Sequence, residues 1–132
     1  MMPKQNQELA NKYYTRSIAS SEKGEVDKAI EDYTKAIELN PEFAEAYYQR
    51  GLAYSKRGEI EKAIADYTQA ITLKPDYADA YYSRGGAFLR LDEREKAEID
   101  LTTARNMGAD AITALDKILQ DHDRAWKVLG NA

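Results

Sequence analysis

The chain has 132 residues, of which 43% are hydrophobic and 32% charged, as is ordinary for a soluble, helix-rich protein. Its formal net charge of −4 argues against a nucleic-acid partner, because a general nucleic-acid binder needs a basic surface. No cysteine is present, which excludes disulfides, and no apolar run approaches the roughly 20 residues that span a bilayer, so we expect no membrane partner. The first residues lack the features of a secretion signal, and cytoplasmic is the default location.

Helical periodicity and turn residues divide most of the chain into three helix pairs. We expect helices over residues 4–23 and 26–39, 43–57 and 60–73, and 77–91 and 94–107. Gly24 and Gly58 separate the helices of the first two pairs, because glycine accepts the left-handed backbone that ends a helix. Pro41 and Pro75 close these pairs, since proline cannot donate the next backbone hydrogen bond. In the third pair Asp92 replaces the turn glycine.

The three pairs repeat with a period of about 34 residues. Each first helix contains adjacent tyrosines: Tyr13-Tyr14, Tyr47-Tyr48 and Tyr81-Tyr82. Alanines recur in the second helices: Ala29, Ala63 and Ala97, then Ala36, Ala70 and Ala104. Gly51 and Gly85 lie inside first helices, where glycine costs up to about 1 kcal/mol relative to alanine, a cost that close helix approach can offset. We therefore expect stacked helices, with inter-helix packing by Tyr13, Tyr33, Tyr47, Tyr54, Tyr67 and Tyr81.

The combined pattern resembles the tetratricopeptide repeat. In the second pair it consists of Tyr47, Gly51, Tyr54, Ala63, Tyr67, Ala70 and Pro75. The resemblance covers about residues 10–111 and implies an all-α fold, a right-handed superhelical array of helix-turn-helix repeats (an α-solenoid). It implies one domain over residues 1–132, with repeats at about 10–43, 44–77 and 78–111. It also implies a non-enzymatic protein–protein interaction module, whose first helices line a concave groove that binds a peptide or partner segment.

Residues 111–129 predict a closing helix with one apolar face, which would cover the exposed edge of the third repeat. Trp126 on this helix is a candidate anchor for self-association, so a self-assembling scaffold, by dimerisation or end-to-end stacking, stays open as an alternative function. His122 is flanked by Asp121 and Asp123, but adjacent helix positions point in different directions, so we expect no metal site. No phosphate loop or catalytic constellation appears, so we expect neither a cofactor nor an enzyme.

The second tyrosine of each pair is turned about 100° around the helix from the first. Under the geometry that the resemblance implies, it faces the groove, in a stripe with acidic and apolar neighbours. The expected binding residues are Asn11, Tyr14, Ile18, Glu45, Tyr48, Gln49, Leu52, Asp79, Tyr82 and Ser83. Such a surface suits a protein or peptide with apolar or aromatic and basic side chains. The alternative is that these tyrosines only pack against adjacent first helices.

One branch of the resembled family captures a C-terminal carboxylate with lysine, asparagine and arginine from its first helices. The corresponding positions of this chain hold other residues: Tyr14, Ile18, Gln49, Asp79 and Ser83. A carboxylate would meet no cation at these positions and one like charge. We therefore do not expect a ligand of the carboxylate-clamp type.

Overall fold

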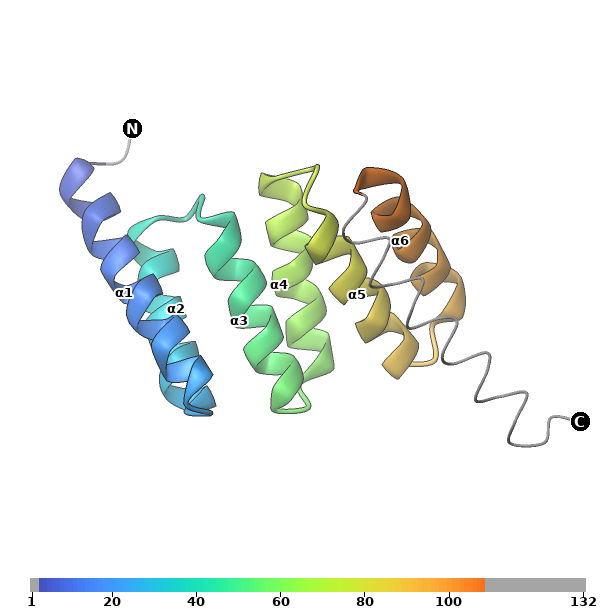
Figure 1. Cartoon of the computed structure of the whole chain (residues 1–132), viewed down its shortest axis with the longest axis horizontal. Coiled ribbons are helices and arrows are strands. Elements are labelled where there is room, and N and C mark those ends of the chain that lie inside the picture. Colours follow the sequence, from blue (N-terminus) through green and yellow to red (C-terminus); the bar gives the residue numbers. More distant parts are fainter. Residues whose placement is uncertain (1–2, 109–132) are drawn as a thin grey trace, which may run out of the picture.

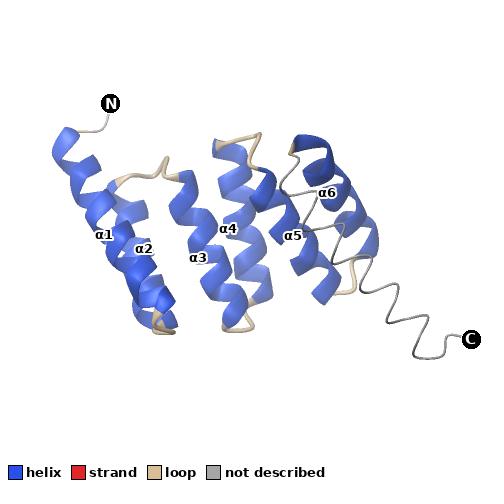
Figure 2. Cartoon of the chain, in the orientation of Figure 1, coloured by secondary structure: helices blue, strands red, loops and turns tan. Residues whose placement is uncertain are grey.

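The computed structural model describes residues 3–108, and in this range the chain forms six helices and no strand (Figures 1 and 2). The helices are α1 (Lys4–Glu22), α2 (Val26–Leu39), α3 (Ala44–Lys56), α4 (Ile60–Leu73), α5 (Ala78–Arg90) and α6 (Arg94–Met107). Each helix packs mainly on its sequence neighbours, so three helix pairs stack side by side along the molecule (Figure 1). The predicted all-α solenoid is confirmed.

The turn inside each pair has the same backbone conformation. Gly24 and Gly58 have φ of 80° and 82°, the left-handed geometry expected of a helix-terminating glycine. Asp92, at the corresponding place in the third pair, also has a positive φ, of 59°. Aspartate is one of the few residues other than glycine that adopt this region with little penalty. The third turn therefore keeps its shape despite the substitution.

The predicted close approach within each pair is confirmed. A Cβ atom built on Gly51 would lie 2.6 Å from the Tyr67 ring, and one on Gly85 would lie 2.8 Å from the Leu101 side chain. Ala29, Ala63 and Ala97 are fully buried on the opposing second helices. Small residues on both helices let the backbones approach, and large side chains fill the remaining space.

An arginine–aspartate pair connects the two helices of each repeat, and sequence reasoning did not find these contacts. Each guanidinium donates two hydrogen bonds of 2.7–2.8 Å to a buried carboxylate: Arg16 to Asp32, Arg50 to Asp66 and Arg84 to Asp100. Two of these arginines also donate to a threonine of the preceding repeat, Arg50 to Thr34 at 3.2 Å and Arg84 to Thr68 at 3.1 Å. Arg50 and Arg84 therefore also join successive repeats.

The second helices begin and end where expected, whereas the first helices are one or two residues shorter. Phe43 and Tyr77, expected to be helical, have ψ of 81° and 83° and precede α3 and α5. No helix within residues 3–108 is long and apolar enough to cross a membrane. The predicted closing helix, with His122 and Trp126, lies outside the described residues.

Candidate functional site

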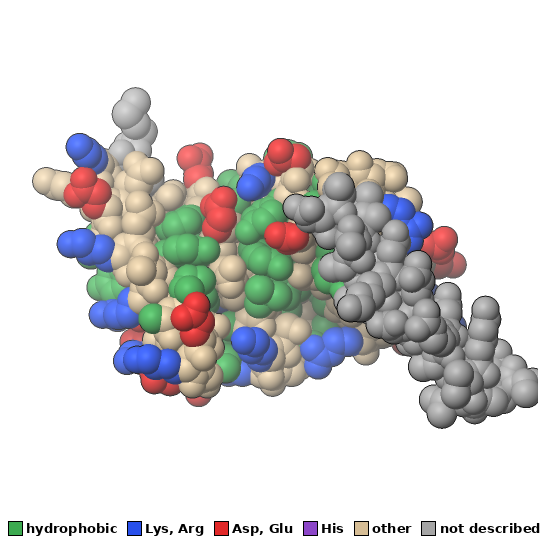
Figure 3. Space-filling model, viewed as in Figure 1, with side chains coloured by type: hydrophobic (Ala, Val, Ile, Leu, Met, Phe, Trp, Pro, Cys, Tyr) green, Lys and Arg blue, Asp and Glu red, His purple; other side chains and the backbone are tan. Residues whose placement is uncertain are grey.

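The helices α1, α3 and α5 carry the residues predicted to bind a partner. Tyr14, Tyr48 and Tyr82 occupy equivalent places on them and are all half-buried. We call the surface around these three residues the tyrosine face. Figure 3 shows hydrophobic side chains gathered between α1 and α3 and again between α3 and α5, with acidic side chains beside them.

Three aromatic rings meet where the first repeat joins the second, in a cluster that we call the first junction: Tyr14, Tyr33 and Phe43. The Tyr14 ring centroid lies 4.8 Å from that of Phe43 and 6.0 Å from that of Tyr33. Tyr33 belongs to α2 and is fully buried, while Phe43 precedes α3. Tyr14 therefore packs where two repeats meet, and its ring partners are not on the adjacent first helix.

The corresponding cluster where the second repeat joins the third is the second junction: Tyr48, Tyr67 and Tyr77. The Tyr48 centroid lies 5.1 Å from that of Tyr77 and 5.8 Å from that of Tyr67. The Tyr48 hydroxyl is also hydrogen-bonded, at 3.2 Å, to the hydroxyl of Ser83 on α5. Two ring contacts and a polar contact thus hold Tyr48 between the second and third repeats.

Tyr82 differs from the other two residues of the tyrosine face. In the third repeat, Leu101 occupies the position that the buried Tyr33 and Tyr67 occupy in the first two. Within residues 3–108 Tyr82 contacts no aromatic ring. It is nevertheless only half-buried, so part of its ring faces solvent. Of the three tyrosines, Tyr82 is therefore the one without a ring contact among the described residues.

Carboxylates lie close to the phenols of this face. Burial raises the pKa of Tyr14, and the negative charge of Glu45 raises it further. Burial also raises the pKa of Tyr77, with Glu45 adding to the effect. For Tyr48 burial is again the main cause of a raised pKa, opposed by the hydrogen bond to Ser83. The hydroxyls therefore stay protonated at neutral pH and remain able to donate hydrogen bonds.

The remaining predicted residues are divided between open surface and packing. Asn11 and Asp79 are exposed, and Glu45, Gln49 and Ile18 are half-buried. Leu52 is also half-buried and packs on the core cluster around Tyr67, so it supplies less free apolar surface than expected.

Sequence reasoning missed three residues of this region: Phe43, Tyr77 and Lys74. The Lys74 Nζ atom lies 4.6 Å from the centroid of the Tyr77 ring and 3.9 Å from Oε1 of Glu45. The repeat period could have revealed Phe43 and Tyr77, because they are 34 residues apart and each directly precedes the alanine that begins a first helix. No comparable signal marks Lys74, because its counterpart in the first repeat is Asn40.

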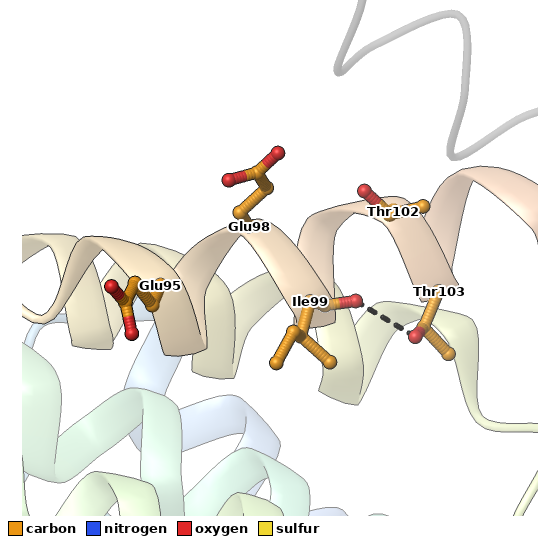
Figure 4. A pocket seen from close by; sticks show the side chains of 5 residues that line it. All are labelled: Glu95, Glu98, Ile99, Thr102 and Thr103. Carbon is orange, nitrogen blue, oxygen red and sulfur yellow. Dashed lines mark hydrogen bonds between the residues drawn. The ribbon is translucent and has the colours of Figure 1, made fainter.

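No group of three or more histidine, aspartate or glutamate residues within 3–108 is placed to hold a metal ion. A shallow depression of about 470 Å³ on α6 is lined by Glu95, Glu98, Ile99, Thr102 and Thr103. Figure 4 shows Glu98 and Thr102 pointing to one side of the helix and Ile99 and Thr103 to another. These side chains do not converge on a common point, so we assign no site there.

Comparison with known proteins agrees with this architecture. The sequence profile described as TPR repeat matches residues 21–56 and 54–92, and the chain belongs to the tetratricopeptide repeat family. The family mediates protein–protein interaction. No curated protein matches the sequence.

Several solved structures are similar. MamA is 36% identical with a TM-score of 0.73, and the match covers 74% of this chain but only 57% of the MamA chain. The second TPR of Spaghetti (RPAP3), bound to the HSP90 peptide SRMEEVD, is 32% identical with a TM-score of 0.77, over 79% of this chain and 96% of that one. The Arabidopsis OM64 TPR domain is 26% identical with a TM-score of 0.80, over 89% and 98% of the two chains.

Proposed function

We propose that this chain is a non-enzymatic interaction module that binds an extended protein segment with aromatic and basic side chains across its tyrosine face. The observation that carries the proposal is the row Tyr14, Tyr48 and Tyr82, half-buried beside Glu45 and Asp79. Partly exposed tyrosines supply rigid contact area and hydroxyl donors, which is why they are enriched at interfaces. The nearby carboxylates favour a cationic ligand.

The ligand differs in charge from SRMEEVD, the peptide that the first TPR of Spaghetti (RPAP3) binds as well as the second. Both of those domains are bound to SRMEEVD, which has three acidic residues, and so three side-chain carboxylates, among its last four residues. At the positions that would hold such a carboxylate this chain has no lysine or arginine, and Asp79 there is exposed. An acidic C-terminus would be repelled, whereas a lysine or arginine would be attracted.

Selection from a random peptide library tests the proposal, because such a library offers ligands of every charge and aromatic content. The purified chain is immobilised, and phage-displayed dodecapeptides are selected at near-physiological salt. We expect the enriched peptides to combine aromatic residues with lysine or arginine. Enrichment of acidic peptides, or no enrichment, would overturn the proposal.

Tyr82 is the residue to change when the selected peptide is titrated. Because Tyr82 contacts no ring among the described residues, Tyr82→Ala should preserve the fold and weaken binding by about tenfold, as central interface aromatics commonly do. Tyr54→Phe is the control, since Tyr54 is not among the predicted binding residues and its ring lies 5.5 Å from Lys62 Nζ on α4. Equal affinity for Tyr82→Ala and the native chain would place the binding site elsewhere. Light scattering on the same samples would then show whether self-association is the function instead.

A further inference from the structure

Lys74 is placed as an internal ligand of the tyrosine face. Its ammonium group lies 4.6 Å from the centroid of the Tyr77 ring and 3.9 Å from the Glu45 carboxylate. The carboxylate is on α3, whereas Tyr77 and Lys74 both lie in the segment between α4 and α5. The Lys74 and Glu45 side chains are 45% and 46% exposed, so solvent reaches and weakens the contact.

An aromatic face beside a carboxylate is a general receptor for a cationic side chain. The ring attracts the cation through its quadrupole, and the carboxylate adds a charge-assisted hydrogen bond. The Tyr77 ring is held in place by Tyr48, at 5.1 Å between centroids, so the receptor is preorganised by the second junction. Tyr48 itself belongs to the proposed binding face.

The first junction has no such receptor. The residues corresponding to Lys74, Glu45 and Tyr77 are Asn40, Asn11 and Phe43, which carry no charge. Elsewhere, Lys62 makes a comparable contact, with its Nζ atom 5.5 Å from the Tyr54 centroid and 3.2 Å from Glu59. Substitution of Lys62 is therefore a matched control for substitution of Lys74, because each removes a lysine that lies beside an aromatic ring and a carboxylate.

We infer that Tyr77 and Glu45 form a subsite for one lysine or arginine side chain of the bound segment, and that Lys74 occupies this subsite until the partner displaces it. The inference rests on the proposed function and specifies where the basic residue binds. Lys74 would lower the affinity for partners that place a cation in the subsite, because they must displace it, and would leave unchanged the affinity for partners that do not. It would therefore act as a specificity-determining residue.

The subsite can be tested with two small probes by NMR titration of the full ¹⁵N-labelled chain. N-acetyl-arginine methylamide carries the cation, and N-acetyl-citrulline methylamide has nearly the same shape without the charge. In Lys74→Met we expect the arginine probe to bind about threefold or more tightly than in the native chain, with the largest shifts at Glu45 and Tyr77. The citrulline probe should bind equally weakly to both. Lys62→Met should behave as the native chain does.

Two results would overturn the inference. Unchanged or weaker arginine binding in Lys74→Met would show that Lys74 does not occupy the subsite. An affinity gain that persists in Lys74→Met/Glu45→Gln would show that Glu45 does not form it. Failure of the proposed function looks different: the arginine probe would still shift Glu45 and Tyr77, while Tyr82→Ala would leave binding of the selected peptide unchanged.

Discussion

The first and second junctions have similar ring packing and different charges. Tyr14 lies 4.8 Å from Phe43, and Tyr48 lies 5.1 Å from Tyr77, each pair beside a buried tyrosine of the neighbouring second helix. The charged contact between Lys74 and Glu45 occurs only at the second junction, because the first has asparagine at both positions. Charge at the surface of a junction can therefore change while the rings that join the repeats keep their arrangement.

The largest expected effect tests whether the two junctions are structurally equivalent. Tyr33→Ala and Tyr67→Ala each remove a ring that is at most 1% exposed, and each should lower the free energy of unfolding by about 3–5 kcal/mol. Urea unfolding followed by circular dichroism measures both losses. Values that differ by more than about 2 kcal/mol, a gap wider than the spread expected for one kind of site, would mean that the junctions do not share one packing scheme.

The arginine–aspartate pairs offer the next largest effect. Arg50 is 17% exposed and also donates to Thr34, so Arg50→Met should cost about 2–3 kcal/mol by leaving Asp66 buried without its cation. Arg16 is 56% exposed and its guanidinium donates only to Asp32 among the described hydrogen bonds. Arg16→Met should therefore cost less. Thermal unfolding of both variants at one salt concentration checks the order, and a larger loss for Arg16→Met would contradict it.

Alkaline pH should destabilise both junctions, because burial favours the uncharged phenol. Burial raises the pKa of Tyr33 from 10.0 to about 12. Because the folded-state pKa of Tyr33 lies above the unfolded value, Tyr33 contributes its full stabilisation below pH 10 and loses it as the pH rises through 12. The expected loss in the free energy of unfolding is about 2–3 kcal/mol. Urea unfolding at about pH 9, 10.5 and 11.5 should show this decline, and Tyr33→Phe should make it shallower. An equal slope in Tyr33→Phe would assign the decline to other groups.

The smallest effect comes from copying the charge of the second junction into the first. Asn11→Glu places a carboxylate at the position that corresponds to Glu45. Because Asn11 is exposed, the gain in affinity for a selected basic peptide should be only about 0.5–1 kcal/mol, and it should shrink as salt is added. Calorimetric titration of Asn11→Glu against Asn11→Gln isolates the charge. Equal affinities for the two variants would mean that the first junction does not contact the basic part of the peptide.

The helix limits show how far the sequence could be interpreted. Glycine and proline mark both ends of the second helices, so the expected ranges 26–39 and 60–73 agree with α2 and α4. Phe43 and Tyr77 were expected inside the first helices because their apolar rings fit the periodic pattern. Their non-helical backbone instead turns the rings back onto Tyr14 and Tyr48. Phe43 and Tyr77 are 34 residues apart, so the repeat period marks them as equivalent positions. The local residue pattern does not show that the backbone at these positions is non-helical.

The sequence by itself determined the repeat, its helices and the close approach of each pair, because these depend on local backbone preferences and on side-chain size at regular spacing. Only the tertiary structure decided which groups meet between helices and between repeats. Arg50 reaches Asp66 across a turn and Thr34 in the preceding repeat, and Lys74 and Tyr77, from the segment between α4 and α5, meet Glu45 on α3. Such contacts depend on how the stacked helices are placed in space, and periodicity along the chain carries no information on that placement.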